Sequence, residues 1–323
     1  MKSRVICAIP VYNGEQFIQQ TLESVAAQTQ RPDRVVVLDN CSTDRTPEIV
    51  KNFRGLALEY VRNPTNLGLF GNFNRALELA PETDYLHILH ADDLIEPRFY
   101  EVLTGLLEDC PGRGMAWCLD ERIDENNRRL SVSGRPNGRV RVLAMDKFLR
   151  LKAEIGNQAF CATLLKTAYE PAPCKFRLDM PILGDMVFWA EWGTHCKKIV
   201  TVNLPLAKYR WHGRNETVSL APNIQSLIVD EWRTMQICES LRGHRAGPVR
   251  WFKLKGLLAV RSGIKAKRFQ QLGNPAYARE IVRVARGITG PVPWVLGQVL
   301  VQLRELLVYK LGGRPRHPKN VFS

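Results

Sequence analysis

The chain has 323 residues, of which 45% are hydrophobic and 24% are charged, and its formal net charge is +14 at pH 7. This composition indicates a globular protein with one large α/β domain or two smaller domains. None of the eight cysteines stand in a C-x-x-C spacing, which disfavours a zinc site or a disulfide framework and favours reduced thiols in the cytoplasm.

The two ends of the chain differ in charge. Residues 250–323 contain 15 Lys and Arg but only two Glu, whereas residues 1–249 are nearly neutral. Such an asymmetry points to a polyanionic partner, either a membrane surface or a nucleic acid. The first residues, MKSRVICAIPVYNG, lack the apolar core of a signal peptide. No run of about 18 uncharged apolar residues occurs, so no membrane-spanning helix is expected.

Apolar and amphipathic segments alternate along the first 90 residues. Short apolar runs predict strands, and apolar residues at helical spacing between them predict helices. The expected strands cover 4–10, 34–40, 56–62 and 85–90, and the expected helices cover 15–28, 42–53 and 69–80. This strand–helix order is typical of a mostly parallel α/β sheet with helices on both faces.

Polar and aromatic residues, together with a proline and a glycine, stand at the ends of the four predicted strands. In chain order they are Pro10, Tyr12 and Asn13, then Asp39 and Asn40, then Arg62, Asn63, Asn66 and Gly68, and last His90, Asp92 and Asp93. Parallel sheets bind ligands at the carboxyl ends of their strands, where these residues would meet. Each has an ordinary alternative, because Asp39 could begin a turn and Tyr12 could pack in the core. Their joint position at one edge favours a ligand site.

The adjacent carboxylates of Asp92 and Asp93 repel each other, and neither is easily buried alone. A hard divalent cation that also contacts phosphate oxygens removes this repulsion. A nucleotide diphosphate held through such a cation therefore fits this edge of the sheet. In that arrangement Tyr12 offers a stacking face for a base, and Asp39 accepts a hydrogen bond from a base N–H.

Four segments of the chain resemble successive blocks of family 2 glycosyltransferases. They are AIPVYNGEQFIQQTLESVAAQ, VVVLDNCSTDRTPEIV, NLGLFGNFNRAL and LHADDLIEP, and the similarity extends over residues 4–215. The family consists of inverting enzymes of the GT-A fold that use nucleotide-diphospho-sugars. The resemblance implies a GT-A catalytic domain over residues 1–245, with a mostly parallel sheet flanked by helices. A basic helical extension would follow over residues 246–323.

The resemblance also implies a donor site. Asp92 and Asp93 match the motif that binds Mn²⁺ or Mg²⁺ and the diphosphate, with Asp93 as the direct ligand. The residues expected at the nucleotide of the donor, a UDP-sugar being favoured, are Pro10, Tyr12, Asn13, Asp39, Asn66, Gly68, His90 and Asp92. The family often has Asp in place of His90. Two interpretations of this histidine are open: a hydrogen bond to the ribose or diphosphate, or no chemical role.

A later segment, ILGDMVFWAEW at residues 182–192, resembles the part of the family that carries the general base at the start of a helix. The matching residue is Asp185. Its ordinary alternative is a helix cap, and Asp179 and Glu191 are rival carboxylates nearby. The apolar neighbours from Met186 to Trp189 would raise the pKa of Asp185 and favour proton uptake.

The stretch YRWHGRNET, residues 209–217, resembles the family's last loop, which closes over the donor. The residues expected to contact the diphosphate are Arg210, His212 and Arg214. An ordinary basic surface loop is the alternative. Three tryptophans are either platforms for an acceptor sugar or core residues: Trp189, Trp192 and Trp211.

The basic end of the chain is predicted to be helical over residues 251–270, 276–287 and 292–311. In a helical projection of the last segment, one polar stripe is formed by Gln298, Gln302, Glu305 and Tyr309, and aliphatic residues fill the remainder. Such a helix either lies in the interface of an anionic membrane or packs on the protein or on a second copy.

An inverting glycosyltransferase fits these observations best. It would move a sugar from a nucleotide-diphospho-sugar to a saccharide or lipid-linked saccharide, in bacterial cell-surface polysaccharide or glycolipid assembly at the cytoplasmic face of the cell membrane. A sugar nucleotidyltransferase would need a Gly-rich loop after the first strand, which PVYNGEQF lacks. A nucleic-acid-binding protein would leave the acidic strand ends unexplained, so nucleic acid is not the expected partner.

Overall fold

The computed structural model describes residues 4–155, 159–212, 224–243 and 246–310, without the side chains of 224–226 and 303–310. The chain divides into two compact units. The first comprises Met1–Phe148, Asn157–Leu178 and Phe188–Gly213, and the second comprises Leu149–Gly156, Asp179–Val187 and Arg214–Ser323.

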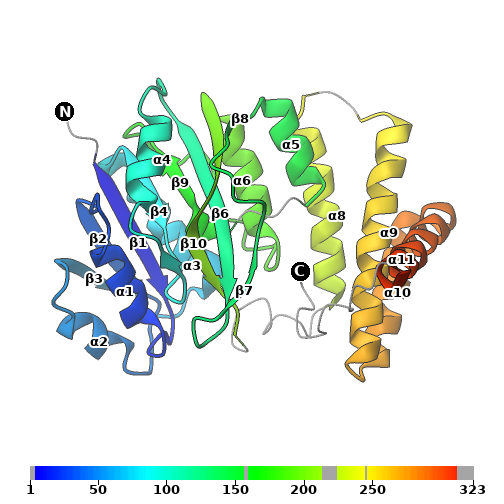
Figure 1. Ribbon diagram of the computed structural model, residues 1–323, viewed down its shortest axis with the longest axis horizontal. Coiled ribbons are helices and arrows are strands. Elements are labelled where there is room, and N and C mark those ends of the chain that lie inside the picture. Colours follow the sequence, from blue (N-terminus) through cyan, green and yellow to red (C-terminus); the bar gives the residue numbers. More distant parts are fainter. Residues whose placement is uncertain (1–3, 156–158, 213–223, 244–245, 311–323) are drawn as a thin grey trace. The chain divides into compact units, whose positions relative to one another are not determined.

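The first unit is built around one mixed sheet (Figure 1). Its strands are β1 (Val5–Val11), β2 (Arg34–Asp39), β3 (Leu58–Arg62), β4 (Tyr85–Ile88), β5 (Leu94–Ile95), β6 (Gly114–Ile123), β7 (Arg129–Val132), β8 (Val140–Val142), β9 (Thr163–Lys166) and β10 (Lys198–Arg210). Its helices are α1 (Ile18–Ala26), α2 (Thr46–Asn52), α3 (Gly68–Leu77) and α4 (Phe99–Leu107), with 3₁₀ turns at Ala80–Glu82 and Phe160–Ala162. Residues of both units contribute to α5 (Met145–Ala153) and α6 (Gly184–Thr194).

The strands and helices expected before residue 90 are all present, within four residues of their expected bounds. The largest difference is the start of α2 at Thr46 instead of residue 42. Asp44 accounts for it, because its Oδ1 accepts a hydrogen bond from the backbone N of Thr46 at 3.0 Å and folds the preceding residues into a turn. Pro47 then occupies the first turn of the helix, where its missing N–H is tolerated.

The sheet has the order β3-β2-β1-β4-β9-β6-β10-β5, with β7 beside β6 and β8 beside β10. The four N-terminal strands pair in parallel, as the strand–helix alternation predicts. β6 and β10 are also parallel, whereas the pairings of β5, β7, β8 and β9 are antiparallel. No strand after residue 90 was expected from the sequence. Strands β5 to β10 therefore extend the predicted sheet.

The central strand β1 is buried along its whole length. Helix α1 buries Ile18, Leu22 and Val25, which are spaced four and three residues apart and so share one face of the helix. Full burial of each aliphatic side chain of this size contributes about 1.5–3 kcal/mol. This packing fixes the carboxyl end of β1, where the candidate site begins.

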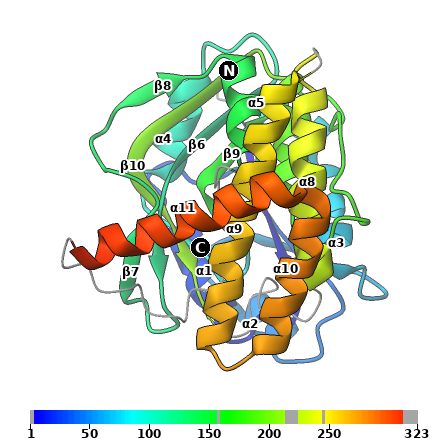
Figure 2. The ribbon, with the colours of Figure 1, turned by 90° about the vertical axis from the view of Figure 1, so that its right-hand side faces the viewer.

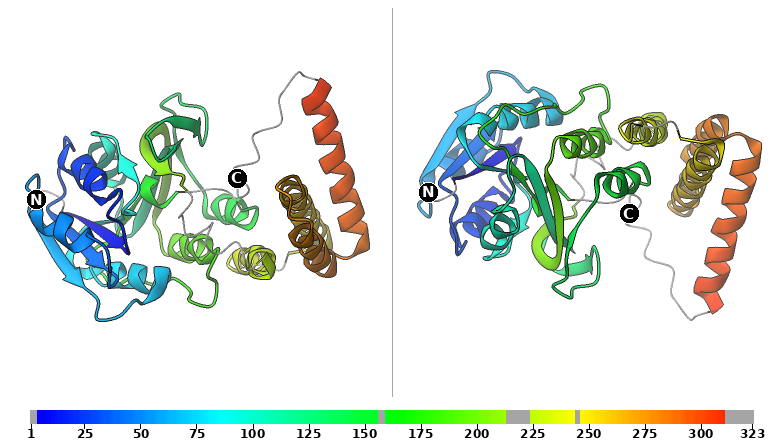
Figure 3. Two further views of the ribbon diagram at one scale, coloured as in Figure 1. Left: turned by 90° about the horizontal axis from the view of Figure 1, so that it is seen from below. Right: turned by 90° about the horizontal axis from the view of Figure 1, so that it is seen from above.

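The second unit contains α8 (Ile224–Ser240), α9 (Pro248–Gln271), α10 (Pro275–Thr289) and α11 (Pro291–Lys310). The last three confirm the helices expected near the C-terminal end, and each begins at a proline, which is favoured in a first helical turn. α9 and α10 lie side by side, and α11 crosses them (Figures 2 and 3). Among the helices that the structure describes, none is both long and apolar enough to cross a bilayer.

Candidate active site

The carboxyl ends of neighbouring strands meet at one edge of the sheet. In the parallel registers, Val11 of β1 lies beside Asp39 of β2, and Asp39 lies beside Arg62 of β3. β4 pairs with β1 as far as Ile88, opposite Ala8, and the polar residues that follow β4 continue from the same edge. The structure thus brings together the strand ends on which the predicted site depends.

His90, Asp92 and Asp93 form a compact group after β4. One ligand atom from each residue can be chosen so that all three lie within 4.8 Å of one another, and Asp93 is fully buried. The rings of Phe73 and Phe160 pack against the His90 ring, with centroids 5.2 and 5.0 Å away. Carboxylate oxygens and an imidazole nitrogen are suitable ligands for a divalent cation such as Mn²⁺ or Mg²⁺.

One oxygen of Asp93 supports this fit. Asp93 Oδ2 faces His90 Nδ1 at 3.4 Å and receives no hydrogen bond of ordinary geometry from the described residues. A buried carboxylate oxygen without a donor costs free energy, which a bound cation would offset. The residues present therefore fit a divalent cation.

The two adjacent carboxyl groups have pKa values displaced in opposite directions. Burial and the charge of Asp92 raise the pKa of Asp93. Burial acts on Asp92 in the same sense, but a hydrogen bond from His212 and the charge of His90 together outweigh it, so the pKa of Asp92 is lowered. Like charges this close do not both ionise easily. Asp92 therefore carries the negative charge first, and a bound cation would favour ionisation of Asp93.

His212 lies directly at this carboxylate pair. Its Nε2 is 2.9 Å from Asp92 Oδ2, and its ring packs against Phe17, with centroids 4.9 Å apart. The sequence predicted that His212 contacts a diphosphate. The structure places His212 beside Asp92 and Asp93, the residues expected to hold the diphosphate through a cation. Trp211 is half-buried next to it, and Arg214 lies outside the described residues.

Arg210 is buried beneath the pair, with 0% of its surface exposed. Its backbone N–H donates to Asp93 Oδ1 at 2.8 Å, and its Nε donates to the carbonyl oxygen of Asp92 at 2.7 Å. The guanidinium also donates to the side-chain oxygens of Gln20 and Asn127 at 3.0 and 2.6 Å. An exposed contact between Arg210 and a diphosphate, as expected from the sequence, does not fit this geometry. Arg210 instead holds the turn that carries the two carboxylates.

The end of β1 presents an aromatic ring to solvent. Tyr12 is 48% exposed, so its face is accessible for stacking on a base. Asn13 has a φ of 51°, in the left-handed region, and its Oδ1 accepts a hydrogen bond from the backbone N of Thr43 at 2.8 Å. Pro10 is buried inside β1, opposite Leu38 of β2 and past the last residue of β1 that pairs with β4.

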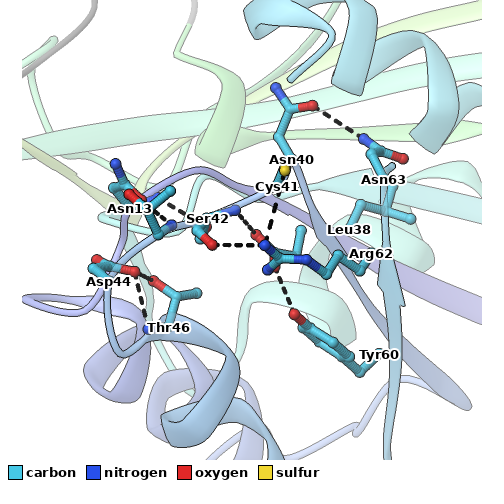
Figure 4. A network of polar contacts seen from close by, with 12 residues as sticks. Asn13, Leu38, Asn40, Cys41, Ser42, Asp44, Thr46, Tyr60, Arg62 and Asn63 are labelled. Carbon is cyan, nitrogen blue, oxygen red and sulfur yellow. Dashed lines mark hydrogen bonds and ion pairs between the residues drawn. The ribbon is translucent and has the colours of Figure 1, made fainter. Parts of the chain in front are cut away.

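A polar network joins the ends of β2 and β3, and Figure 4 shows Arg62 within it. Asp39 is fully buried, and its Oδ2 accepts hydrogen bonds from the Tyr60 hydroxyl at 2.5 Å and from Arg62 Nη1 at 2.6 Å. Its Oδ1 accepts from the backbone N of Ser42 at 2.9 Å. Because the exposed Arg62 side chain pairs with Asp39, a base that bonds to Asp39 would have to displace it. The base-binding role of Asp39 stays a prediction.

Asn66 and Gly68 shape the loop after β3. The Asn66 Oδ1 accepts hydrogen bonds from Asn40 Nδ2 at 2.7 Å and from the backbone N of Gly68 at 2.8 Å. Gly68 has a φ of 72°, which glycine adopts at little cost. The Asn40 Oδ1 in turn accepts from Asn63 Nδ2 at 3.1 Å. These amides hold the loop in position, and direct contact of Asn66 and Gly68 with a donor stays a prediction.

Asp185 lies in the first turn of α6 and is half-buried, at the helix start where the sequence pattern places it. Lys152 of α5 interacts electrostatically with it. Burial lowers the pKa of Lys152 to about 7, and the negative charge of Asp185 opposes that shift. A lysine that remains protonated here would favour the ionised, proton-accepting form of Asp185.

The two rival carboxylates are both engaged in ion pairs. Asp179 pairs with Arg233, and Glu191 pairs with Arg177 at 2.7 Å. To accept a proton from an acceptor hydroxyl, each of these two carboxylates would have to give up its ion pair.

Two of the three tryptophans belong to the core. Trp189 and Trp192 are 1% and 0% exposed, and they pack against Phe160 and Phe188. Neither presents a face on which an acceptor sugar could stack, so the interpretation as core residues is the correct one for both.

Some residues of the site carry no signal in the sequence. The side-chain oxygens of Gln20 and Asn127 accept hydrogen bonds from the Arg210 guanidinium. The three residues are far apart in the chain, and no local pattern predicts that they meet. Tyr60 had a usable signal, because it stands two residues before Arg62 on β3 and so points to the same face as that residue.

A family model described as Glycosyl transferase family 2 matches residues 6–168, just over half of the chain. The chain belongs to this family. The resemblance inferred from four sequence segments is thereby confirmed. The matched residues include β1 to β4 and the His90–Asp92–Asp93 group.

Curated relatives match parts of the chain. The uncharacterized protein MT1568 of Mycobacterium tuberculosis is 31% identical over 142 residues, and the alignment covers 44% of each chain. The chain therefore spans less than half the length of this relative. The uncharacterized glycosyltransferase alr2836 of Nostoc sp. is 25% identical over 231 residues, 68% of each chain.

Solved structures share the fold of this chain. TarS 1-349 of S. aureus in complex with UDP-GlcNAc superposes with a TM-score of 0.58 at 16% identity, covering 97% of this chain and 93% of that one. The mannosyltransferase PcManGT of Pyrobaculum calidifontis, in complex with GDP-Man and Mn²⁺, gives a TM-score of 0.54 at 19% identity, covering 96% and 81%. The expected fold, an α/β sheet of the GT-A type followed by basic helices, is confirmed.

Proposed function

We propose that this glycosyltransferase transfers a sugar from a nucleotide-diphospho-sugar, preferably a UDP-sugar, to a saccharide or lipid-linked saccharide with inversion at the anomeric carbon. The observation that carries the proposal is the His90–Asp92–Asp93 group at the sheet edge that also bears Tyr12. Solved neighbours hold UDP-GlcNAc, UDP and GDP-Man, which supports a donor of this class.

In this proposal Asp92 and Asp93 hold Mn²⁺ or Mg²⁺ together with the diphosphate. A bound divalent cation would supply charge stabilisation for the departing nucleoside diphosphate. Arg210 and His212 position the two carboxylates, since one holds the turn from beneath and the other bonds to Asp92. Tyr12 stacks on the base, and Asp39 accepts a hydrogen bond from it after Arg62 has been displaced.

Asp185 is the proposed general base. It accepts the proton of the acceptor hydroxyl, whose oxygen forms the new bond to the anomeric carbon on the face opposite the breaking bond to phosphate. Inversion follows from this single displacement. Lys152 interacts electrostatically with Asp185, and the protonated form of this lysine would favour the ionised form of Asp185.

The proposed acceptor rests on similarity to a named relative. Poly(ribitol-phosphate) beta-N-acetylglucosaminyltransferase TarS of Staphylococcus aureus is 36% identical over 112 residues, 34% of this chain and 19% of that protein. Its name describes transfer of a sugar to a polymer, poly(ribitol-phosphate), and we propose that the acceptor here likewise belongs to a bacterial cell-surface polymer. We place the catalytic domain in residues 1–245 and a membrane-facing basic extension in residues 246–323, at the inner face of the cell membrane.

The proposal is tested by incubating the full chain with a panel of UDP-, GDP- and dTDP-sugars and measuring release of the nucleoside diphosphate. Release is expected with Mn²⁺ or Mg²⁺ and is expected to stop when EDTA is added. The anomeric configuration of the product, measured by NMR, is expected to be opposite to that of the donor. Release that is indifferent to EDTA would overturn the metal assignment, and retained configuration would overturn the inverting mechanism.

A further inference from the structure

The outward face of α11 is apolar. Its exposed side chains, each 45–58% exposed, are Val292, Val295, Leu296, Val299 and Leu300. At 100° per residue they span an arc of about 140° on the helix surface. Residues 287–303 contain no charged side chain, so no charge interrupts this face. A contiguous exposed apolar patch of this kind marks an interaction surface.

Contacts with α9 fix the direction in which this apolar face points. Trp294 and Val301 of α11 are buried, and Gln298 Nε2 donates a hydrogen bond to the carbonyl oxygen of Ala259 in α9 at 3.1 Å. A Cβ atom on Gly297 would lie only 2.7 Å from the Cβ atom of Ala259, which shows how closely the two helices cross. The predicted polar stripe thus meets α9 at Gln298, and the aliphatic residues face outward.

A basic groove borders the apolar face. It has a volume of about 980 Å³ and is formed by α9, α10 and α11, the helices that cross in Figure 2. Its charged lining residues are Lys267, Arg279, Arg283 and Arg286. No carboxylate lines it among the described side chains, which do not include those of 303–310. Arg283 pairs with Glu280 at 2.6 Å at its edge. Pro291 and Gln298 of α11 complete the lining and lie on the side of that helix next to Val295.

We propose that the outward face of α11 and this basic groove form one docking surface for an anionic phospholipid bilayer. The aliphatic side chains enter the membrane interface, and the guanidinium groups bind lipid phosphates. A bilayer offers an apolar region directly beside a layer of phosphates, which matches the arrangement of the two features. Docking on a bilayer would hold the enzyme near a lipid-linked acceptor, a role that rests on the proposed function.

Two other occupants match the surface less well. A nucleic acid would supply phosphates but no apolar partner for α11. A second copy of the chain would cover the apolar face, but it would bring together two basic groups of residues of the same sign. Only the bilayer complements both the apolar face and the charged groove.

The test is co-sedimentation of the full chain with phosphatidylcholine vesicles that contain or lack phosphatidylglycerol. The wild-type chain is expected to bind the anionic vesicles and to bind them more weakly, but still measurably, at high salt. Arg279→Gln with Arg286→Gln is expected to lower the partition coefficient about 25-fold and to flatten its salt dependence. Leu296→Gln with Leu300→Gln is expected to lower it at least tenfold and to remove the binding that survives high salt.

Matched variants separate the surface from general charge and hydrophobicity. Lys255→Gln with Arg31→Gln removes the same charge outside the groove, and Leu130→Gln with Leu151→Gln removes exposed apolar side chains of the same kind elsewhere. Both control pairs are expected to lower vesicle binding far less. Equal losses in the test and control pairs would overturn the proposal. Binding to an oligonucleotide that competes with the vesicles, and that Leu296→Gln with Leu300→Gln does not weaken, would also overturn it. A dimer that is dissociated only by this leucine double variant would overturn it as well.

Nucleotide binding distinguishes a failure of this surface from a failure of the proposed function. UDP titrated into the same variants with Mn²⁺ is expected to bind as it does to the wild-type chain, because the groove is remote in sequence from the donor residues. Vesicle binding without UDP binding would leave the docking surface standing and refute the donor assignment. UDP binding by a wild-type chain that ignores anionic vesicles would refute the docking surface alone.

Discussion

His212 Nε2 lies 2.9 Å from Oδ2 of Asp92, across 120 residues of sequence. The pairing of β10 with β5 makes this possible, because Lys208 stands opposite Leu94 and the chain continues from there to the histidine. The residues that follow β10 thus lie against the carboxylates that follow β4. His212 thereby fixes the orientation of Asp92, one of the proposed metal ligands.

We expect His212→Phe to weaken Mn²⁺ binding about 10- to 100-fold, the usual effect of losing a group that orients a metal ligand. Phenylalanine keeps the ring contact with Phe17 but removes the hydrogen bond to Asp92. Isothermal titration of Mn²⁺ in the presence of UDP measures the effect. His195→Phe, at an exposed position, is the control. Unchanged affinity in the His212 variant would refute the orienting role.

Asp93→Asn should abolish the metal-dependent part of UDP binding while the fold survives. The amide oxygen can still accept the hydrogen bond from the backbone N–H of Arg210, but the group no longer carries the negative charge that attracts a cation. Calorimetry with and without EDTA gives the comparison, and Asp109→Asn at an exposed site is the control. If EDTA lowers the affinity of the Asp93 variant as much as that of the wild type, Asp93 is not a ligand.

Arg210→Met is expected to destabilise the protein by about 3–5 kcal/mol, because it removes one partner of a buried ionic and hydrogen-bonded network. The side chain loses its hydrogen bonds to Asp92, Gln20 and Asn127. Urea unfolding followed by tryptophan fluorescence provides the measurement. Arg129→Met removes an exposed arginine and should change stability by less than about 1 kcal/mol. Similar losses in both variants would show that the Arg210 network contributes little.

Sequence alone predicted the parts of the fold that local patterns determine. The apolar run at Val5–Val11 and the helical spacing of Ile18, Leu22 and Val25 are local features, and both elements form as expected. The carboxylates Asp92 and Asp93 could likewise be placed at a strand end, because the strand that precedes them is continuous and apolar.

Sequence did not predict how distant side chains share the site. Arg210 was expected to face a ligand, yet its guanidinium satisfies the side chains of Gln20 and Asn127, and no local pattern links these three positions. The pairing of Arg62 with Asp39 was missed for a similar reason, since it depends on the register between β2 and β3. Strand register is set by the whole sheet and not by the residues that follow a single strand.

We expect Lys152 to make the free energy of unfolding depend on pH. Replacing Lys152 with methionine should remove this dependence. Its pKa is lowered by burial from 10.5 to about 7, so between about pH 7 and 10.5 the unfolded chain binds a proton there that the folded chain does not. The contribution of Lys152 to the unfolding free energy therefore rises as pH rises through this window.

Relative to the wild type, the stability of Lys152→Met is expected to fall by about 1.4 kcal/mol for each pH unit from 7 to 10. Urea unfolding at a series of pH values measures this difference. The control is Lys147→Met, which replaces an exposed lysine of α5 and should show no such trend. Parallel pH profiles for wild type and Lys152→Met would mean that the buried lysine keeps an ordinary pKa.

Asp185→Asn is expected to retain UDP-sugar binding and to lose about 10²–10⁴-fold in the rate of transfer, because the amide cannot accept the acceptor proton. The same substitution removes a negative charge that raises the pKa of Lys152, so the pKa of Lys152 should fall further in the variant. That second readout shows whether the substitution acts at the expected place. Asp179→Asn and Glu191→Gln, which break ion pairs with Arg233 and Arg177, should alter the rate far less. Normal turnover by Asp185→Asn, with a lowered pKa of Lys152 confirming the local effect, would transfer the role of general base to one of these two carboxylates.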